Sequence, residues 1–404
     1  MRLDLLIDRE PFGKIFSRTL SSYLASQFNW SGDIRCKRSK PRLKKYFLVN
    51  TKLNLIHPRT LNTNSLRLLA SEYAYHPNLT RRIAQRLYVY YAVSMPLRRL
   101  FSSYYVLIHP FPAECANWCI LPGNNSIRII DIKNNECIVL QKDGFNKNYM
   151  RNLIWLRKQH PELPGPRLFQ ADQGFGWYSE ERIQGLPLNR MDNDSRITSA
   201  LISARKSMLR LYDQTSSEVE WSVWRPLITQ KIYGALDSLP DVYSLSLRKQ
   251  VENVVKTLVL YLAEFHKEEK PIDIVQSHGD FQPANIIIPT VSDQRLVYLI
   301  DWEYTEKRCR WYDAMVFELH SRSPVGLASR ISEWLSDENI AFLSIQWCGI
   351  DKTGSSARYI VATFLLEDLL LRLVDTTIPG LRQPNSGFLR FIDELLSVNL
   401  GSSS

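Results

Sequence analysis

Two kinds of hydrophobic pattern alternate in blocks along the chain. Between residues 112 and 142, short β-branched runs lie between polar turns at 122–126 and 134–135, which predicts three consecutive antiparallel strands. From residue 189 to 268, and again after residue 313, apolar residues recur at intervals of three and four, which predicts helices over 247–265 and 357–374. We therefore expect an α+β fold with a small antiparallel β lobe and a large helical lobe.

A polar cluster lies next to a further pair of short apolar runs. The runs at 285–288 and 296–300 flank a polar loop and predict a hairpin. Asp280 and Asn285 then lie on the loop entering the first strand, and Asp301 follows the second. Magnesium prefers such oxygen ligands, and a positioned carboxylate can take a proton from a hydroxyl. The pattern predicts a phosphoryl-transfer centre in which Asn285 and Asp301 bind Mg2+ and Asp280 is the catalytic base.

Two sequence motifs connect this cluster to a known group of enzymes. His278, Asp280 and Asn285 fit the pattern His-x-Asp-x-x-x-x-Asn, and 300–303 reads Ile-Asp-Trp-Glu. Here the chain resembles the aminoglycoside phosphotransferases and choline kinases, which are small-molecule relatives of the protein kinases. The resemblance implies a protein-kinase-like two-lobed fold, with ATP and Mg2+ as cofactors and a hydroxyl as acceptor. It also suggests that Asp313 caps the next helix, and we expect His278 to brace the loop by hydrogen bonds.

The same resemblance assigns nucleotide-binding residues. Lys142, at the end of the third predicted strand, corresponds to a lysine that reaches the α- and β-phosphates. Backbone groups from Glu181 to Ile183 correspond to the segment that contacts adenine. The helix predicted over 146–159 contains no Glu or Asp, although the family pattern places there the acid that holds the lysine. Asp143 or an acid of the extension could replace it; otherwise the lysine is held differently, or the protein is catalytically impaired.

The chain divides into three expected parts: a basic N-terminal extension over 1–110, a small nucleotide-binding lobe over 111–184, and a large lobe over 185–400. The formal net charge is +10, but residues 1–110 hold 19 Lys and Arg against 5 Asp and Glu, and the remainder hold 32 against 36. The basic excess therefore belongs to the extension, and its densest run is 35–45. Such a run is either a solvated face or a patch for an anionic membrane surface or a phosphorylated glycan, with nucleic acid least favoured.

Residues 80–93 of the extension predict a basic amphipathic helix. At helical spacing, Arg81, Arg82 and Arg86 share one side, and the other side is apolar, with Ile83, Leu87, Tyr90 and Tyr91. Such a helix can lie in a membrane interface, or its apolar stripe can pack onto a neighbouring domain. Both interpretations stay open at this point.

The cysteines and the hydrophobic segments of the sequence bear on the cellular location of the protein. Six cysteines are scattered without paired Cys-x-x-Cys spacing, so neither a zinc site nor a disulfide framework is indicated. The N-terminus lacks an apolar core of signal-peptide length, and no window approaches eighteen uninterrupted apolar residues. We expect a cytoplasmic protein that is peripheral at the inner membrane surface if the basic extension binds lipid.

The acceptor is the least constrained part of the prediction. Glu367 and Asp368, on the helix over 357–374, could face the acceptor, which we expect to be a small molecule, a sugar or a glycan. Two rival functions remain. In one, the protein is a catalytically inactive kinase-like scaffold or regulatory protein; in the other, it is a protein kinase.

Overall fold

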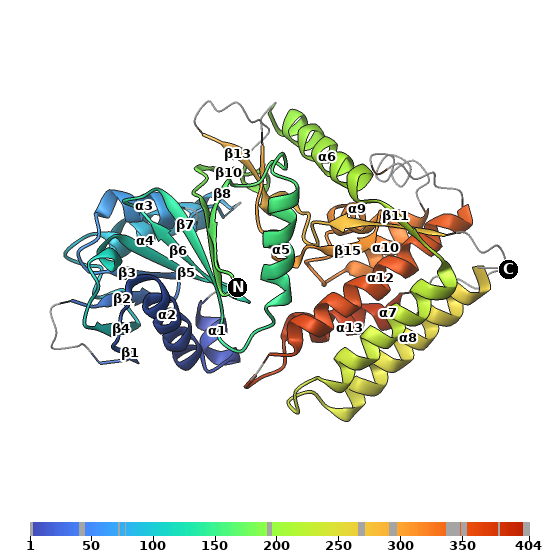
Figure 1. The fold of residues 1–404 in the computed structure, drawn as a ribbon, viewed down its shortest axis with the longest axis horizontal. Helices are drawn as coiled ribbons and strands as arrows, with labels where there is room; N and C mark the ends of the chain where they lie inside the picture. The colour runs from blue at the N-terminus through green and yellow to red at the C-terminus, as the bar shows by residue number, and fades with distance from the viewer. Residues whose placement is uncertain are drawn as a thin grey trace. The chain divides into compact units, whose positions relative to one another are not determined.

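The computed structural model describes residues 3–39, 45–71, 73–76, 78–191, 196–265, 271–290, 297–336, 348, 354–378 and 380–398. It has two compact units (Figure 1). Unit 1 consists of residues 1–154 and 166–182, and unit 2 consists of residues 155–165 and 183–404. Helix α5 (Asn148–Gln159) runs from one unit into the other. The predicted fold class, with an antiparallel β lobe and a helical lobe, is confirmed.

Unit 1 is built on a nine-stranded antiparallel sheet with the order β1-β4-β2-β3-β5-β6-β7-β9-β8. The three strands predicted from the sequence are β5, β6 and β7, which pair in succession with Ile129 opposite both Ile120 and Ile138. The nine strands are β1 (Asp33–Lys37), β2 (Phe47–Asn50), β3 (Leu55–Pro58), β4 (Tyr104–His109), β5 (Trp118–Pro122), β6 (Ser126–Asp131), β7 (Glu136–Gln141), β8 (Leu168–Ala171) and β9 (Trp177–Glu181).

One face of this sheet is covered by the first two helices of the chain, α1 (Leu3–Arg9) and α2 (Phe12–Phe28). Apolar residues recur along α2 at intervals of three and four, which gives it one buried stripe. Because side chains alternate along a strand, Ile138 and Leu140 of β7 point to the same face. They share one hydrophobic core with Phe16 and Leu20 of α2.

The structure differs from the expected division at residue 110. Strands β1 to β4 all precede that position, and β3 pairs with β5, which follows it. Residues before and after 110 therefore belong to one sheet and one hydrophobic core. Helices α3 (Thr63–Ser71) and α4 (Leu79–Val93) lie in the connection from β3 to β4. Part of the basic run at 35–45, residues 40–44, lies outside the described residues.

Unit 2 contains two small sheets that hold the predicted catalytic segment. The predicted hairpin is present as β13 (Ile286–Pro289) and β14 (Tyr298–Leu299), which pair antiparallel together with β10 (Gly185–Pro187). In the second sheet, β12 (Ile272–Ser277) lies between β11 (Ser217–Val219) and β15 (Glu306–Cys309). The segment between β12 and β13 holds Asp280 and Asn285, and the segment between β14 and β15 holds Asp301. Both connections start or end in paired strands, which fixes their positions.

Helices make up most of the remainder of unit 2. The two long helices predicted from periodicity are α8 and α12, each slightly longer than expected. No described helix of the chain is long and apolar enough to cross a membrane. The helices of unit 2 are α6 (Arg196–Thr215), α7 (Trp221–Asp237), α8 (Leu245–Phe265), α9 (Tyr312–Glu318), α10 (Leu327–Ser336), α12 (Gly354–Thr376) and α13 (Ser386–Ser397).

Candidate active site

The loop after β12 is held in place by Asp313. Its Oδ2 accepts hydrogen bonds from the backbone N–H of His278 at 2.7 Å and from the hydroxyl of Tyr212 at 2.9 Å, and its Oδ1 accepts from the N–H of Gly279 at 2.9 Å. The sequence predicted that Asp313 caps α9, but the structure shows that it does not. Asp313 lies in the first turn of α9, after Trp311, and no side chain caps that helix. It instead anchors the loop that carries Asp280.

Gly279 and His278 shape this loop. Gly279 has φ +84°, and a Cβ at this position would collide with the backbone carbonyl of Tyr304, so only glycine fits. The His278 ring contacts the Ile300 carbonyl through Nε2 at 3.0 Å, and its Nδ1 accepts the Asp280 N–H at 3.2 Å. Burial lowers the pKa of His278, so the neutral ring can donate from Nε2 and accept at Nδ1. This geometry supports a bracing role.

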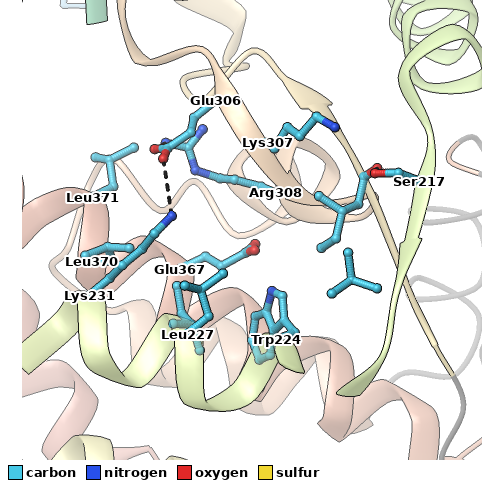
Figure 2. A pocket seen from close by; sticks show the side chains of 13 residues that line it. Ser217, Trp224, Leu227, Lys231, Glu306, Lys307, Arg308, Glu367, Leu370 and Leu371 are labelled. Carbon is cyan, nitrogen blue, oxygen red and sulfur yellow. Dashed lines mark hydrogen bonds and ion pairs between the residues drawn. The ribbon is translucent and has the colours of Figure 1, made fainter. Parts of the chain in front are cut away.

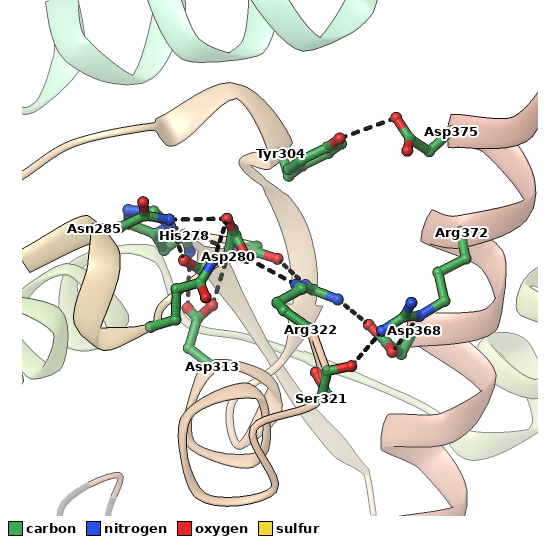
Figure 3. A network of polar contacts seen from close by, with 12 residues as sticks. His278, Asp280, Asn285, Tyr304, Asp313, Ser321, Arg322, Asp368, Arg372 and Asp375 are labelled. Atoms are coloured by element: carbon green, nitrogen blue, oxygen red, sulfur yellow. Dashed lines mark hydrogen bonds and ion pairs between the residues drawn. The ribbon is translucent and has the colours of Figure 1, made fainter. Parts of the chain in front are cut away.

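The carboxylate of Asp280 is buried and held from three directions (Figure 3). Its Oδ1 accepts from Arg322 Nε at 2.8 Å and from Gln282 Nε2 at 3.0 Å, and its Oδ2 accepts from Asn285 Nδ2 at 2.8 Å. Burial raises the pKa of Asp280, and the charge of Arg322 opposes that rise. The carboxylate is thus oriented by donors on one side while 8% of the residue stays exposed.

Asn285 and Asp301 were predicted as metal ligands. Asn285 donates from Nδ2 to the carbonyl and to the carboxylate of Asp280, both at 2.8 Å, and none of the described residues donates to its Oδ1. Its carbonyl accepts from Ile300 N–H at 3.0 Å, so it lies directly beside the residue that precedes Asp301. Asp301 has φ +68°, a left-handed conformation that is rare outside glycine.

These positions suit a metal ion that takes few of its ligands from the protein. In the described part of the chain, no three His, Cys, Asp or Glu side chains form a group that could hold a metal by themselves. Magnesium usually takes only one or two protein ligands, with phosphate and water completing the shell. Asn285 Oδ1 and the Asp301 carboxylate supply two oxygens, and the Asp301 charge reaches far enough to raise the pKa of Asp280. The donor set therefore fits Mg2+ bound together with a nucleotide.

Sequence reasoning missed Arg322, which links Asp280 to a second carboxylate. Besides its bond to Asp280, it donates from Nη1 to Asp368 Oδ1 at 2.5 Å and from Nη2 to the carbonyl of Gly279 (Figure 3). Burial alone would raise the pKa of Asp368, but Arg372 and Arg322 hold it at about 2. Arg322 lies in a short polar run after α9 that carries no motif, so no local pattern could have identified it.

Glu367 and Asp368 are consecutive on α12 but face different surroundings. Glu367 lines a cavity of about 300 Å³ between β11, α7, β15 and α12 (Figure 2). Its oxygens accept the Cys309 N–H at 3.0 and 3.2 Å, and burial raises its pKa to about 7. Its apolar lining includes Trp224 and leucines of α7 and α12, and Lys231, which also lines it, lies 3.8 Å from Glu306. The cavity is mainly apolar with one buried acid.

Lys142 lies in unit 1, on the sheet face that α1 and α2 cover. Its ammonium contacts Glu10 Oε1 at 2.6 Å and the carbonyl of Asn124 at 2.8 Å, and both charged side chains have no exposed area. Arg9 contacts the other oxygen of Glu10 at 2.8 Å. An acid of the N-terminal segment thus pairs with the lysine, which was one of the alternatives left open. The sealed ammonium does not favour the predicted contact with phosphates.

Glu181 and Ile183 lie on the two sides of the division between the units. Glu181 ends β9, its N–H donates to the carbonyl of Arg167 at 2.8 Å, and unit 2 resumes at Ile183. Because the N–H of Glu181 already has an acceptor, it cannot also donate to an adenine ring. The assignment of both residues to adenine stays a prediction.

Comparison with known proteins gives one family match. A model of the phosphotransferase enzyme family matches residues 146–333. None of the curated proteins compared with the chain matches it.

Three solved structures with similar folds have low sequence identity. Aminoglycoside phosphotransferase APH(3'')-Id from Streptomyces rimosus is 15% identical (TM-score 0.42, covering 63% of this chain and 93% of its own). Choline kinase LicA from Streptococcus pneumoniae is 16% identical (TM-score 0.45, covering 69% of this chain and 93% of its own). An ethanolamine kinase of Plasmodium vivax is 14% identical (TM-score 0.45, covering 83% of this chain and 94% of its own).

The matched segment contains the loop that carries Asp280, both predicted metal ligands, Asp313 and Arg322. The resemblance predicted from the two motifs is confirmed. Over residues 146–333, the chain matches the model of the phosphotransferase enzyme family.

Proposed function

We propose that this protein transfers the γ-phosphate of ATP to a hydroxyl group of a small molecule, a sugar or a glycan. The main support is the arrangement around Asp280, whose carboxylate is oriented by Asn285, Gln282 and Arg322 in a loop fixed by Asp313. In this role Asp280 accepts the proton of the acceptor hydroxyl as the oxygen attacks phosphorus. Its raised pKa makes it a better proton acceptor than an exposed aspartate.

Asn285 and Asp301 would hold the Mg2+ that accompanies the nucleotide. The bound ion would supply positive charge to the phosphate oxygens. Nδ2 of Asn285 is engaged by Asp280, so the amide is turned with its oxygen away from that carboxylate. One residue thereby orients the base and offers a metal ligand.

We place the acceptor in the cavity lined by Glu367. One wall is β15, which pairs with β12 so that Glu306 lies opposite Ser277, and Asp280 follows three residues after Ser277. Arg308 ties this wall to the loop, because it donates to Ser277 Oγ at 2.7 Å and to the carbonyl of Tyr304 at 2.8 Å. The mainly apolar lining favours an alcohol with an apolar body, and the Glu367 carboxyl can hydrogen-bond a polar group of it.

The proposal is tested by Asp280→Ala and Asp301→Ala. Asp280→Ala should lower phosphate transfer by about a hundredfold or more while ATP binding persists, because a general base contributes about 10²–10⁴ in rate. Asp301→Ala should remove Mg2+-dependent nucleotide binding. The measurements are transfer of labelled phosphate from ATP to a panel of sugars and amino alcohols, and thermal shift with ATP and Mg2+. Full turnover by the Asp280 variant would refute its assignment as the base.

We also propose that α4 and its surroundings bind an anionic membrane surface. Ile83, Leu87, Tyr90 and Tyr91 are each about half exposed, and other large apolar residues of this segment are exposed as well. Arginines of α4 lie beside them, and the first 110 residues carry a net charge of +14. Exposed apolar side chains beside basic ones are the features of an interfacial helix. The exposed apolar side chains are Leu68, Tyr75, Leu79, Ile83, Leu87, Tyr90, Tyr91, Met95 and Leu100.

Sedimentation with vesicles tests this surface. The protein should pellet with phosphatidylcholine vesicles that contain phosphatidylserine and remain in solution with phosphatidylcholine alone. Ile83→Asp combined with Leu87→Asp should abolish pelleting. Val223→Asp, at another exposed apolar residue of a surface helix, is the matched control and should have no effect. Equal pelleting of the double variant and the unaltered protein would contradict the proposal.

A further inference from the structure

A second pocket, in unit 1, is distinct from the predicted active site. It has a volume of about 230 Å³ and lies between α2 and the ends of β5, β6, β7 and β9. Its apolar walls are aromatic: Tyr23 and Phe28 of α2 face Trp118 and Trp177 of the sheet, with ring centroids 5.5–6.1 Å apart.

Three carboxylates surround these rings. Glu114, Asp131 and Glu136 line the pocket, and no lysine or arginine is among the described residues that do so. This is unusual in its setting, because residues 1–154 and 166–182 hold 26 Lys and Arg against 12 Asp and Glu. Asp131 and Glu136 also lie directly opposite each other on β6 and β7. Like charges in that position destabilise a sheet, and a retained cost of this kind commonly marks a functional site.

Two buried donors in the same pocket lack an acceptor. Trp177 and Ser179 are 8% and 2% exposed, and among the described residues neither Trp177 Nε1 nor Ser179 Oγ has a hydrogen-bond partner. Both belong to β9 and both line the pocket. An unsatisfied buried donor costs about 1–3 kcal/mol, so a ligand oxygen at this position would remove a real penalty. The pocket thus presents negative charge, aromatic faces and two free donors together.

We propose that this pocket binds a small organic cation that carries a hydroxyl or carbonyl oxygen. The ammonium group would lie against the rings and the carboxylates, as cations do on aromatic faces, and the oxygen would accept from Trp177 and Ser179. Nucleotides and other phosphates are excluded, because all charged lining groups are acidic. A lone metal ion is also a poor fit, since these carboxylates form no metal-binding group. The inference is independent of the proposed phosphotransfer.

Titration calorimetry with matched pairs of ligands tests the proposal. Choline, ethanolamine and glucosamine are the cations, and 3,3-dimethylbutan-1-ol, ethylene glycol and glucose are their neutral counterparts. At least one cation should bind to the unaltered protein, and its neutral counterpart should not. Failure of all three cations up to about 10 mM, which corresponds to a very weak site, or equal binding of a neutral counterpart, would overturn the proposal.

Variants locate the site. Glu136→Gln should weaken binding about tenfold or more, because it removes a charged hydrogen-bonding partner, and Ser179→Ala should weaken it several-fold. Glu181→Gln is the control, since Glu181 lies opposite Glu136 on β9 but does not line the pocket; it should bind normally. Asp280→Asn should also bind normally. Loss of binding in Asp280→Asn with retention in Glu136→Gln would place the cation in unit 2 and refute the inference.

Discussion

Each unit contains a buried cation held by carboxylates, and the two arrangements differ in access. In unit 1, Lys142 and Glu10 have no exposed side-chain area, and Arg9 pairs with the second oxygen of Glu10. In unit 2, the side chains of Arg322 and Asp280 are 18% and 11% exposed. A sealed pair can only hold structure together, whereas a partly open pair can meet a substrate. The comparison favours a structural role for Lys142 and is consistent with the role proposed for Asp280.

The largest expected effect is a loss of stability in Glu10→Ala. The variant leaves the buried Lys142 ammonium without its carboxylate, and loss of one partner of a buried pair typically costs 3–5 kcal/mol. The free energy of unfolding, measured in urea, should fall by roughly that amount. A double variant with methionine at both positions should regain part of it, because it removes the Lys142 charge but leaves the buried Arg9 without its carboxylate.

The controls separate structure from catalysis. Asp143→Ala removes the partner of Arg18 in an exposed pair 3.5 Å apart and should change stability by less than about 1 kcal/mol. The double methionine variant should also retain phosphate transfer if Lys142 is structural. Loss of nucleotide binding in a folded double variant would restore the role predicted for Lys142 from the sequence.

The pair in unit 1 shows where sequence reasoning stops. Strand β7 and the position of Lys142 at its end followed from hydrophobic alternation, as did the strands and helices that hold Asp280, Asn285 and Asp301. Which face of the sheet Lys142 points to depends on what packs there, and α1 and α2 are more than a hundred residues away in sequence. The missing acid of α5 was visible as an absence, but Glu10 could not be named because no spacing links it to Lys142.

The site in unit 2 was predicted more completely because its residues are close in sequence. His278, Asp280 and Asn285 share one loop, and the hairpin register brings Asp301 beside them. Arg322 and Asp313 contact this loop from positions more than thirty residues away in sequence, so both contacts depend on tertiary packing. Local motifs identified the groups proposed to react, and packing determined the groups that orient them.

A second comparison within unit 2 yields a smaller effect, on the pH dependence of stability. Asp368 lies between two arginines and its pKa is about 2, whereas burial raises the pKa of Glu367 from 4.5 to about 7. Protonated Glu367 therefore favours the folded state below about pH 4.5, and this contribution is lost as the pH rises to about 7. The shift corresponds to roughly 3 kcal/mol at 1.36 kcal/mol per pH unit.

Glu367→Gln should remove that contribution, since glutamine keeps an oxygen for the Cys309 N–H and cannot ionise. Urea unfolding of both proteins at pH 5 and pH 8 checks this: the variant should gain stability relative to the unaltered protein at pH 8. Glu394→Gln, at a partly exposed acid of α13 that caps the N-terminus of α10, is the control and should not show a gain. If the variant and the unaltered protein differ in free energy of unfolding by the same amount at pH 5 and pH 8, the assignment of a raised pKa to Glu367 is contradicted.

The smallest effect concerns the pH profile of transfer in Arg322→Ala. Burial raises the pKa of Asp280 and Arg322 lowers it, so removal of the guanidinium should raise that pKa further. Asp280 acts as a base only when ionised, and activity therefore falls as the pH drops through its pKa. The acidic limb of kcat/KM should move to higher pH in Arg322→Ala and return toward its original position in Arg322→Lys, which keeps the charge. A limb that stays in place would show that Arg322 orients Asp280 without tuning its proton affinity.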